Sequence, residues 1–156
     1  MALKKKKRQP SLTTLRDKLD GLVSRYVRLK AADHRGIAHC VSCGKADHWQ
    51  NMDAGHFVSR QATAVRFDLR NIHPQCRRCN RFSSDHLIGY TIWMQEKYGD
   101  AVIAELWARK HEPVKYTRGD YETMIDDMAT KLAKLVSGER ADELPEATRW
   151  ALENVS

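Results

Sequence analysis

The chain has 156 residues, of which 42% are hydrophobic and 30% charged, and its formal net charge is +7. This length and composition predict one folded domain with appendages and exclude a largely disordered chain. No apolar run approaches the ~20 residues that a membrane span needs. The basic start is not followed by the apolar stretch of a secretory signal, so we expect a cytoplasmic protein.

The charge is distributed unevenly along the chain. Residues 1–30 contain ten Lys or Arg and two Asp, whereas residues 120–156 contain four basic and nine acidic residues. A basic front and an acidic end indicate a polyanion as the partner of the first two-thirds of the chain, and we expect DNA. The alternative is ordinary surface charge with a solubilising tail.

Residues 1–10 form a basic arm that we expect to be mobile, either without a role or in contact with phosphates. Its basic residues are Lys4, Lys5, Lys6, Lys7 and Arg8. In the segment 11–33, Ser11 is the expected N-cap of an amphipathic helix over 12–31, because apolar residues recur there at near-helical spacing.

Residues 34–95 are predicted to form an irregular core that metal holds together. Short strands are expected at Ile37–His39 and Trp49–Met52 around a tight turn at Gly44. A further hairpin is expected between His56–Val58 and Ile72–Gln75, across the loop 59–70, and from Arg77 onward the pattern becomes helical.

Residues 96–138 are predicted to be helical. An apolar face made by Ile88, Ile92, Trp93 and Tyr98 is expected on the helix that leads into this region and stops at Gly99. A helix over Ala101–Lys110, a capping box at Thr117–Asp120 and a last helix to about Val136 are expected after it. We expect the aromatic residues here to lie in the core rather than to stack on bases. Residues 139–156 are an acidic tail.

The chain has four cysteines, and they form two Cys-x2-Cys pairs. Such pairs can supply four thiolates to one closed, tetrahedral zinc site, which is structural rather than catalytic. The sequence therefore predicts one structural Zn²⁺ held by Cys40, Cys43, Cys76 and Cys79.

The segment between the two cysteine pairs carries polar residues that zinc does not need. A histidine of near-neutral pKa, such as His56, can accept a proton from water. Asp53 lies three residues before it, and Asn71, His73 and Asn80 lie around the second cysteine pair. These residues indicate a second, working metal site, because carboxylate and amide oxygens suit Mg²⁺ or Mn²⁺.

The order of these residues resembles the HNH (His-Me finger) nuclease motif, and more closely the NinG/Rap recombination nucleases of lambda-like phages. The resemblance covers about residues 36–95. It rests on Cys40-Val-Ser-Cys43-Gly44, Trp49, Asp53-Ala-Gly-His56, Arg66-Phe67, Arg70-Asn71-Ile-His73 and Gln75-Cys76-Arg-Arg-Cys79-Asn80.

The resemblance implies a role for each matching residue. His56 would be the general base, Asn71 would brace the loop and orient the histidine, and Asn80 would ligate a catalytic Mg²⁺ or Mn²⁺. Many members of the superfamily place a further ligand at the position of Gly55. Asp53 is the first choice to replace it, turned inward by a bulge at Gly55. His73 is the second choice, unless it packs or contacts DNA.

The resemblance also implies an endonuclease that cuts branched recombination intermediates, such as Holliday junctions and displacement loops. The expected fold class is α+β, with a zinc-stapled ββα-metal core flanked by helices at both ends, and symmetric cutting suggests a homodimer. A zinc-bearing DNA-binding module without catalysis and a protein–protein adaptor remain alternatives. Arginines expected to hold phosphates, rather than to be merely solvated, are Arg60, Arg66, Arg70, Arg77, Arg78 and Arg81.

Overall fold

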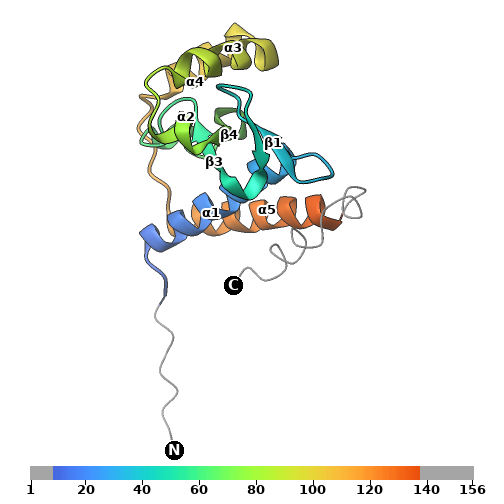
Figure 1. Cartoon of the computed structure of the whole chain (residues 1–156). Coiled ribbons are helices and arrows are strands. Elements are labelled where there is room, and N and C mark those ends of the chain that lie inside the picture. The colour runs from blue at the N-terminus through green and yellow to red at the C-terminus, as the bar shows by residue number, and fades with distance from the viewer. Residues whose placement is uncertain (1–8, 138–156) are drawn as a thin grey trace, which may run out of the picture.

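A computed structural model describes residues 9–137 of the chain (Figure 1). The basic residues Lys4, Lys5, Lys6, Lys7 and Arg8 and the acidic tail 139–156 lie outside the described residues. Two long helices form one layer, a β-hairpin lies on them, and two shorter helices cover the other side of the hairpin (Figure 1). This mixed architecture with small antiparallel sheets confirms the α+β class.

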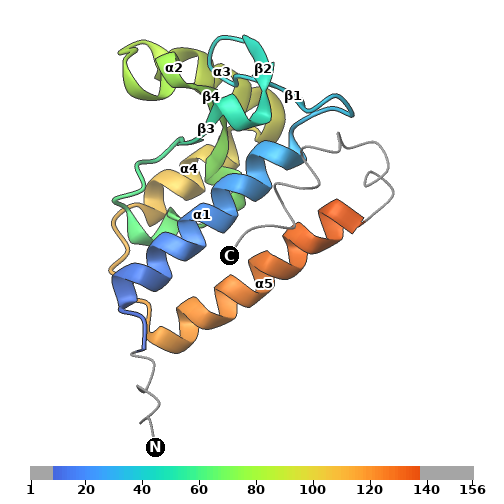
Figure 2. The same ribbon diagram turned by 60° about the horizontal axis from the view of Figure 1, so that its bottom comes forward.

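The first layer consists of α1 (Leu12–Lys30) and α5 (Arg118–Ser137). The two helices lie side by side and run in the same direction (Figure 2). Their facing apolar residues recur every three or four positions and are buried together with Ile72 of the hairpin. The apolar face of each helix therefore packs against the other helix and against the hairpin. The buried helix residues of this cluster are Leu15, Leu19, Val23, Val27, Tyr121, Ile125 and Met128.

Both of these helices begin as the sequence predicts. The Ser11 side chain accepts a hydrogen bond from Thr14 N at 3.1 Å. Thr117 N donates to Asp120 Oδ2 at 2.7 Å, and Asp120 N donates to Thr117 Oγ1 at 3.2 Å. This reciprocal pair is the predicted capping box.

Two antiparallel hairpins follow α1. Strand β1 (Ile37–His39) pairs with β2 (Ala46–His48), and β3 (Met52–His56) pairs with β4 (Ile72–Cys76). The predicted strand Trp49–Met52 is wrong. Trp49–Asn51 form a turn of 3-10 helix, in which the His48 side chain accepts a bond from Gln50 N, and the strand begins only at Met52.

The third layer consists of α3 (His86–Tyr98) and α4 (Asp100–Arg109), preceded by the short α2 (Arg77–Arg81). Helix α3 crosses the predicted boundary at 95/96. Its buried residues are Tyr90 and Met94. Of the predicted apolar face, Trp93 and Tyr98 are partly buried against the core as expected. Ile88 and Ile92 are 67% and 52% exposed, so the prediction is wrong for these two residues.

The orientation of α3 about its own axis goes with a close contact at Gly89. A Cβ on Gly89 would lie 2.9 Å from the carbonyl carbon of Ser42 and closer still to its oxygen. This side of the helix therefore packs directly on the backbone between Cys40 and Cys43. Gly99, with φ +81°, ends α3 as predicted. Among the helices of residues 9–137, none is long and apolar enough to cross a membrane.

Candidate functional site

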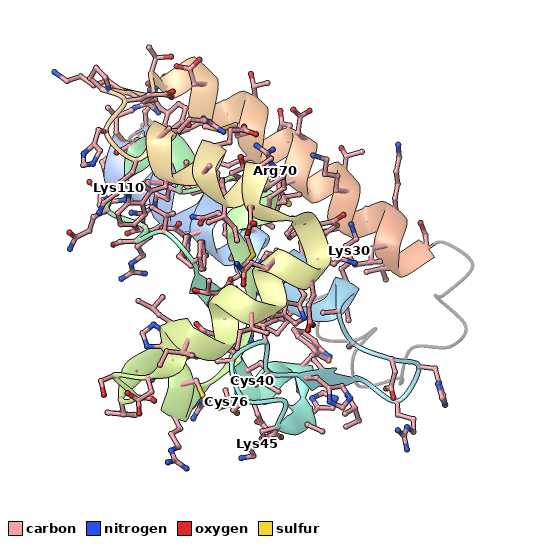
Figure 3. All side chains as sticks on the ribbon, turned by 90° about the horizontal axis from the view of Figure 1, so that it is seen from above. Lys30, Cys40, Lys45, Arg70, Cys76 and Lys110 are labelled. Atoms are coloured by element: carbon pink, nitrogen blue, oxygen red, sulfur yellow. The ribbon has the colours of Figure 1, made fainter. Side chains whose placement is uncertain are left out.

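The four cysteines converge on one point, as predicted. Cys40 and Cys43 lie in the turn after β1, Cys76 ends β4, and Cys79 lies in α2. All four Sγ atoms lie within 4.8 Å of one another, and Figure 3 shows Cys40 and Cys76 close together. Gly44 closes the turn with φ +74°, and its N–H donates to Cys40 O at 2.8 Å.

The spacing of the sulfurs suits a tetrahedral metal. Sγ of Cys43 and Sγ of Cys76 are 3.8 Å apart. Four thiolates at ~2.3 Å from a central zinc would be separated by about 3.8 Å. Burial raises the pKa of the Cys40 and Cys79 thiols, so a bound cation is needed to keep all four deprotonated. The cluster could hold a metal ion such as zinc.

The hairpin β3–β4 places the polar residues with respect to this cluster. Its register is continuous from Met52 opposite Cys76 to His56 opposite Ile72. The bulge that was expected at Gly55 is therefore absent from the described hairpin. Instead, the side chain of Gln75 lies against Gly55, where a Cβ would be 2.5 Å from Cδ. Gly55 leaves room for this buried amide, which explains its place in the motif.

Asp53 of β3 lies beside the start of the helical segment that follows β4. Asn80 Nδ2 donates to Asp53 Oδ2 at 3.0 Å, and Arg81 donates from Nε and Nη2 at 2.7 and 2.8 Å. Burial alone raises the pKa of Asp53, but these hydrogen bonds outweigh it and lower that pKa below its usual value. Asp53 is therefore an ionised carboxylate next to the Asn80 amide, even without a bulge.

His56 ends β3 and has one ring nitrogen engaged. Its Nε2 lies 2.9 Å from the carbonyl oxygen of Arg66. Burial lowers the pKa of His56, so the ring is neutral at physiological pH. A neutral ring that donates from Nε2 carries an unprotonated Nδ1, which is free to accept a proton.

Asn71 is fully buried and holds the loop that carries Arg66. Its Oδ1 accepts from Val58 N at 2.8 Å, and its Nδ2 donates to Val58 O at 2.9 Å and to Val65 O at 3.1 Å. These bonds close the loop on both sides. Because Arg66 O is the partner of His56, Asn71 supports the orientation of the histidine, in line with the bracing role expected from the motif.

Asp53, His56 and Asn80 line one cleft of about 830 Å³. Its cationic side chains are Arg60, Arg81 and Lys110. The later helices and the residues beside them contribute further walls that no spacing in the sequence marks. These residues are His86, Leu87, Trp107 and Lys110. Trp107 is 57% exposed, so the expectation that it belongs to the core is wrong. Leu106, about 100° away around the helix, is buried instead.

His73 does not belong to this cleft. Its Nδ1 lies 2.9 Å from the hydroxyl of Tyr90 and its Nε2 lies 3.0 Å from the hydroxyl of Tyr98. Tyr90 donates its own proton to Gly55 O at 2.9 Å, so His73 donates from Nδ1 and accepts at Nε2. Both nitrogens are occupied, which removes His73 from the candidate metal ligands and makes it a packing residue.

The predicted phosphate-binding arginines fall into two groups. Arg66 is bound by Asp20 of α1, and Arg70 by Asp68 and Glu105. These intramolecular ion pairs contradict the expectation that both arginines are available for phosphates. Within residues 9–137 no acid pairs with Arg60, Arg77 or Arg78, and all three are exposed. Arg81 is held by Asp53.

The fold and the cysteine cluster define a mixed α+β protein with four close cysteines that could hold a metal ion, and with a cationic cleft. Residues 1–139 match the model of the family described as Bacteriophage Lambda NinG protein. The chain therefore belongs to the NinG family.

Three curated relatives are phage proteins, each named protein ninG. Over 96 residues, this chain is 34% identical to that of Salmonella phage P22, 30% to that of Escherichia phage lambda and 38% to that of Escherichia phage 933W. Each alignment covers 57% of this chain and 47% of the relative, so the matched region spans about half the length of these relatives. No solved structure matches the chain.

Proposed function

We propose that this protein is a metal-dependent DNA endonuclease of the HNH type, akin to the Rap recombination nucleases, that hydrolyses phosphodiester bonds in branched recombination intermediates such as Holliday junctions and displacement loops. The observation that supports this best is the meeting of Asp53, His56 and Asn80 in one cleft. They come from β3 and α2, and α2 directly follows β4, which matches a ββα arrangement.

The chemistry of these residues suits attack of water on a phosphodiester. Nδ1 of His56 is the expected proton acceptor, and the bond from Nε2 to Arg66 O keeps the ring in the required tautomer. The carboxylate of Asp53 and the amide oxygen of Asn80 are hard ligands that would hold Mg²⁺ or Mn²⁺. The bound ion would neutralise the negative charge that grows on the phosphate.

The cationic residues of the cleft supply contacts to the DNA backbone. Arg60 and Lys110 lie on its walls, and Arg81 would turn to phosphate if a metal ion took its place at Asp53. These contacts are independent of base sequence, so we expect recognition of DNA structure rather than of sequence. The cysteine cluster, with Zn²⁺ bound, would keep α2 against the hairpin.

The test is cleavage of a synthetic four-way junction, beside a linear duplex of the same sequence, with Mg²⁺ or Mn²⁺. We expect the wild type to cut the junction and His56→Ala to lose at least about a hundredfold in rate, since general bases contribute roughly 10²–10⁴-fold. His111→Ala, an exposed histidine outside the cleft, is the matched control. Full activity of His56→Ala, with unchanged zinc content, would refute the proposal.

A non-catalytic zinc-containing DNA-binding module is the second candidate. Arg77 and Arg78 line a pocket beside Cys43 and Cys76, next to Lys45, and this pocket could bind phosphates without any cleavage. Protein that binds junctions but never cuts them with either metal would favour this function. We also propose a homodimer, because paired cuts need two active sites, and light scattering with and without DNA tests it.

A further inference from the structure

Two exposed apolar side chains stand in the wall of the cationic cleft. Leu87 of α3 is 45% exposed and Trp107 of α4 is 57% exposed, and both line the cleft together with His56. Neither is needed to pack the two helices, because Tyr90, Met94 and Leu106 form the buried cluster between them. These side chains therefore face a ligand or solvent rather than the core.

The rest of the cleft restricts the chemistry of that ligand. Three cationic side chains and two histidines line it, and Asp53, its one acidic residue within the described chain, is already paired with Arg81. A polyanion would complement the positive charges of the cleft, but phosphate groups gain nothing from contact with an indole or an isobutyl side chain. Paired, stacked duplex DNA also offers no base face to them. A polyanion with unstacked bases satisfies both parts of the lining.

We propose that Trp107 and Leu87 hold a nucleobase that is unstacked at a DNA branch, next to the backbone that lies under His56. The inference rests on the proposed binding of DNA in this cleft. It identifies the unstacked base at a branch as the feature of DNA structure that the protein selects. Lys110 supports the indole, since its Nζ lies 4.2 Å from the centre of the Trp107 ring. The same ammonium group is then placed near the phosphate of the held nucleotide.

The experiment compares forked DNA with a linear duplex of the same sequence. An unpaired 2-aminopurine next to the branch reports stacking by its fluorescence. Binding is measured by anisotropy in the His56→Ala background without added Mg²⁺ or Mn²⁺, so that cleavage does not interfere. Trp107→Ala, Trp107→Phe and Leu87→Ala are compared with Leu12→Ala, because Leu12 is 48% exposed but lies on α1 outside the cleft.

We expect Trp107→Ala to weaken binding of the fork on the order of tenfold and to abolish the 2-aminopurine quenching, while duplex binding changes by less than about twofold. Trp107→Phe should restore most of the affinity, and Leu87→Ala should lose more than Leu12→Ala. Equal losses on fork and duplex, or no loss on the fork, would overturn the inference.

The outcome is independent of whether the protein cuts DNA. If the wild type cleaves nothing but Trp107→Ala still loses selectivity for the fork, the nuclease proposal fails and the base-holding site stands. If the wild type cuts junctions but Trp107→Ala binds fork and duplex as before, the nuclease proposal stands and the base-holding site is refuted.

Discussion

Gly55 shows how tightly a single residue can be constrained beside the candidate base. The side chain of Gln75 lies against it, is 1% exposed, and donates to Ser42 Oγ at 2.6 Å. A Cβ at position 55 would come within 2.5 Å of Cδ and 2.8 Å of Cγ of this amide. The buried amide would have to shift to admit this Cβ, and its bond to Ser42 opposes the shift.

We therefore predict that Gly55→Ala destabilises the protein by about 1–3 kcal/mol, the usual cost of overpacking. Gly21→Ala is the control, because no atom lies within 4 Å of a Cβ there and the residue is inside α1. That substitution should stabilise by roughly 0.5–1 kcal/mol. Urea unfolding measures both, and a neutral Gly55→Ala would contradict the packing described for Gln75.

His73 links stability to pH. Burial, with a smaller effect of Lys97, lowers its pKa from 6.5 to about 4. Between these values the unfolded chain takes up a proton that the folded protein refuses, so stability falls as the pH drops from 6.5 towards 4 and the loss levels off below 4. The shift corresponds to a loss of about 3 kcal/mol.

The measurement is the free energy of unfolding at pH 7 and at pH 4.5 for wild type and His73→Phe. Acid also weakens the cysteine cluster, but it does so in both proteins. We expect the variant to be less stable at pH 7, because the Tyr98 hydroxyl loses its bond to His73 and the Tyr90 hydroxyl keeps only its bond to Gly55 O. It should also lose less on acidification than the wild type does. Parallel pH profiles would show that His73 is not the group responsible.

At the scale of elements, the cysteine cluster joins the turn after β1 to the end of β4 and to α2. The turn after β1 contacts β4 through Val41 N, which donates to Pro74 O at 3.0 Å. The buried cluster of apolar residues around the cysteines includes Leu29 of α1 and Leu132 of α5. The cysteine cluster therefore also packs against the C-terminal parts of the two long helices. Metal at the cluster is expected to stabilise all of these contacts together.

We predict that removing the metal with a chelator, or replacing Cys79 by Ser, lowers the melting temperature by more than about 10 °C, since a closed four-sulfur site contributes to folding directly. Much of the helical circular dichroism should remain below the transition, because α1 and α5 bury apolar faces of their own. Metal content is measured in the same samples, and an unchanged melting curve after its complete removal would contradict the prediction.

The elements that the sequence predicted well are those with a local signal. The amphipathic spacing of α1, the capping box before α5 and the stop at Gly99 depend on neighbours within four residues. The prediction of the apolar face of α3 failed at Ile88 and Ile92. The side of this helix that packs inward depends on a contact between Gly89 and Ser42, which lies 47 positions earlier in the chain. Ile88 and Ile92, which the spacing places on the apolar face, are instead exposed on the side of α3 away from Tyr90 and Met94.

The whole molecule decides which charged residues are available to a partner. The motif placed Asp53, His56 and Asn80 in one site because all three lie within a single hairpin and helix. It did not reveal that Asp20 on α1, 46 positions earlier in the chain, binds Arg66, or that Glu105 on α4 binds Arg70. These pairings depend on how the layers stack, which spacing along the chain does not encode.

This division gives a prediction about DNA binding. Arg77→Ala and Arg78→Ala should weaken binding to fork and duplex alike, and each should reduce the slope of log K against log salt by about 1. Arg66→Ala should mainly lower stability, because it leaves the partly buried Asp20 unpaired. Anisotropy titrations over a salt series, with melting curves, separate the effects. A salt slope reduced only in Arg66→Ala would reverse the assignment.

Ser42 links the loop between two of the cysteines to the lining of the cleft. Ser42 lies between Cys40 and Cys43, and Leu87, two residues before Gly89, stands in the wall of the cleft. Ser42 also holds the amide of Gln75, which lies against the residue that precedes His56. Two segments that line the cleft thus contact the same serine, one through Gly89 and one through Gln75. Because this serine lies in the loop between two of the cysteines, we expect metal loading at the cluster to change the width of the cleft.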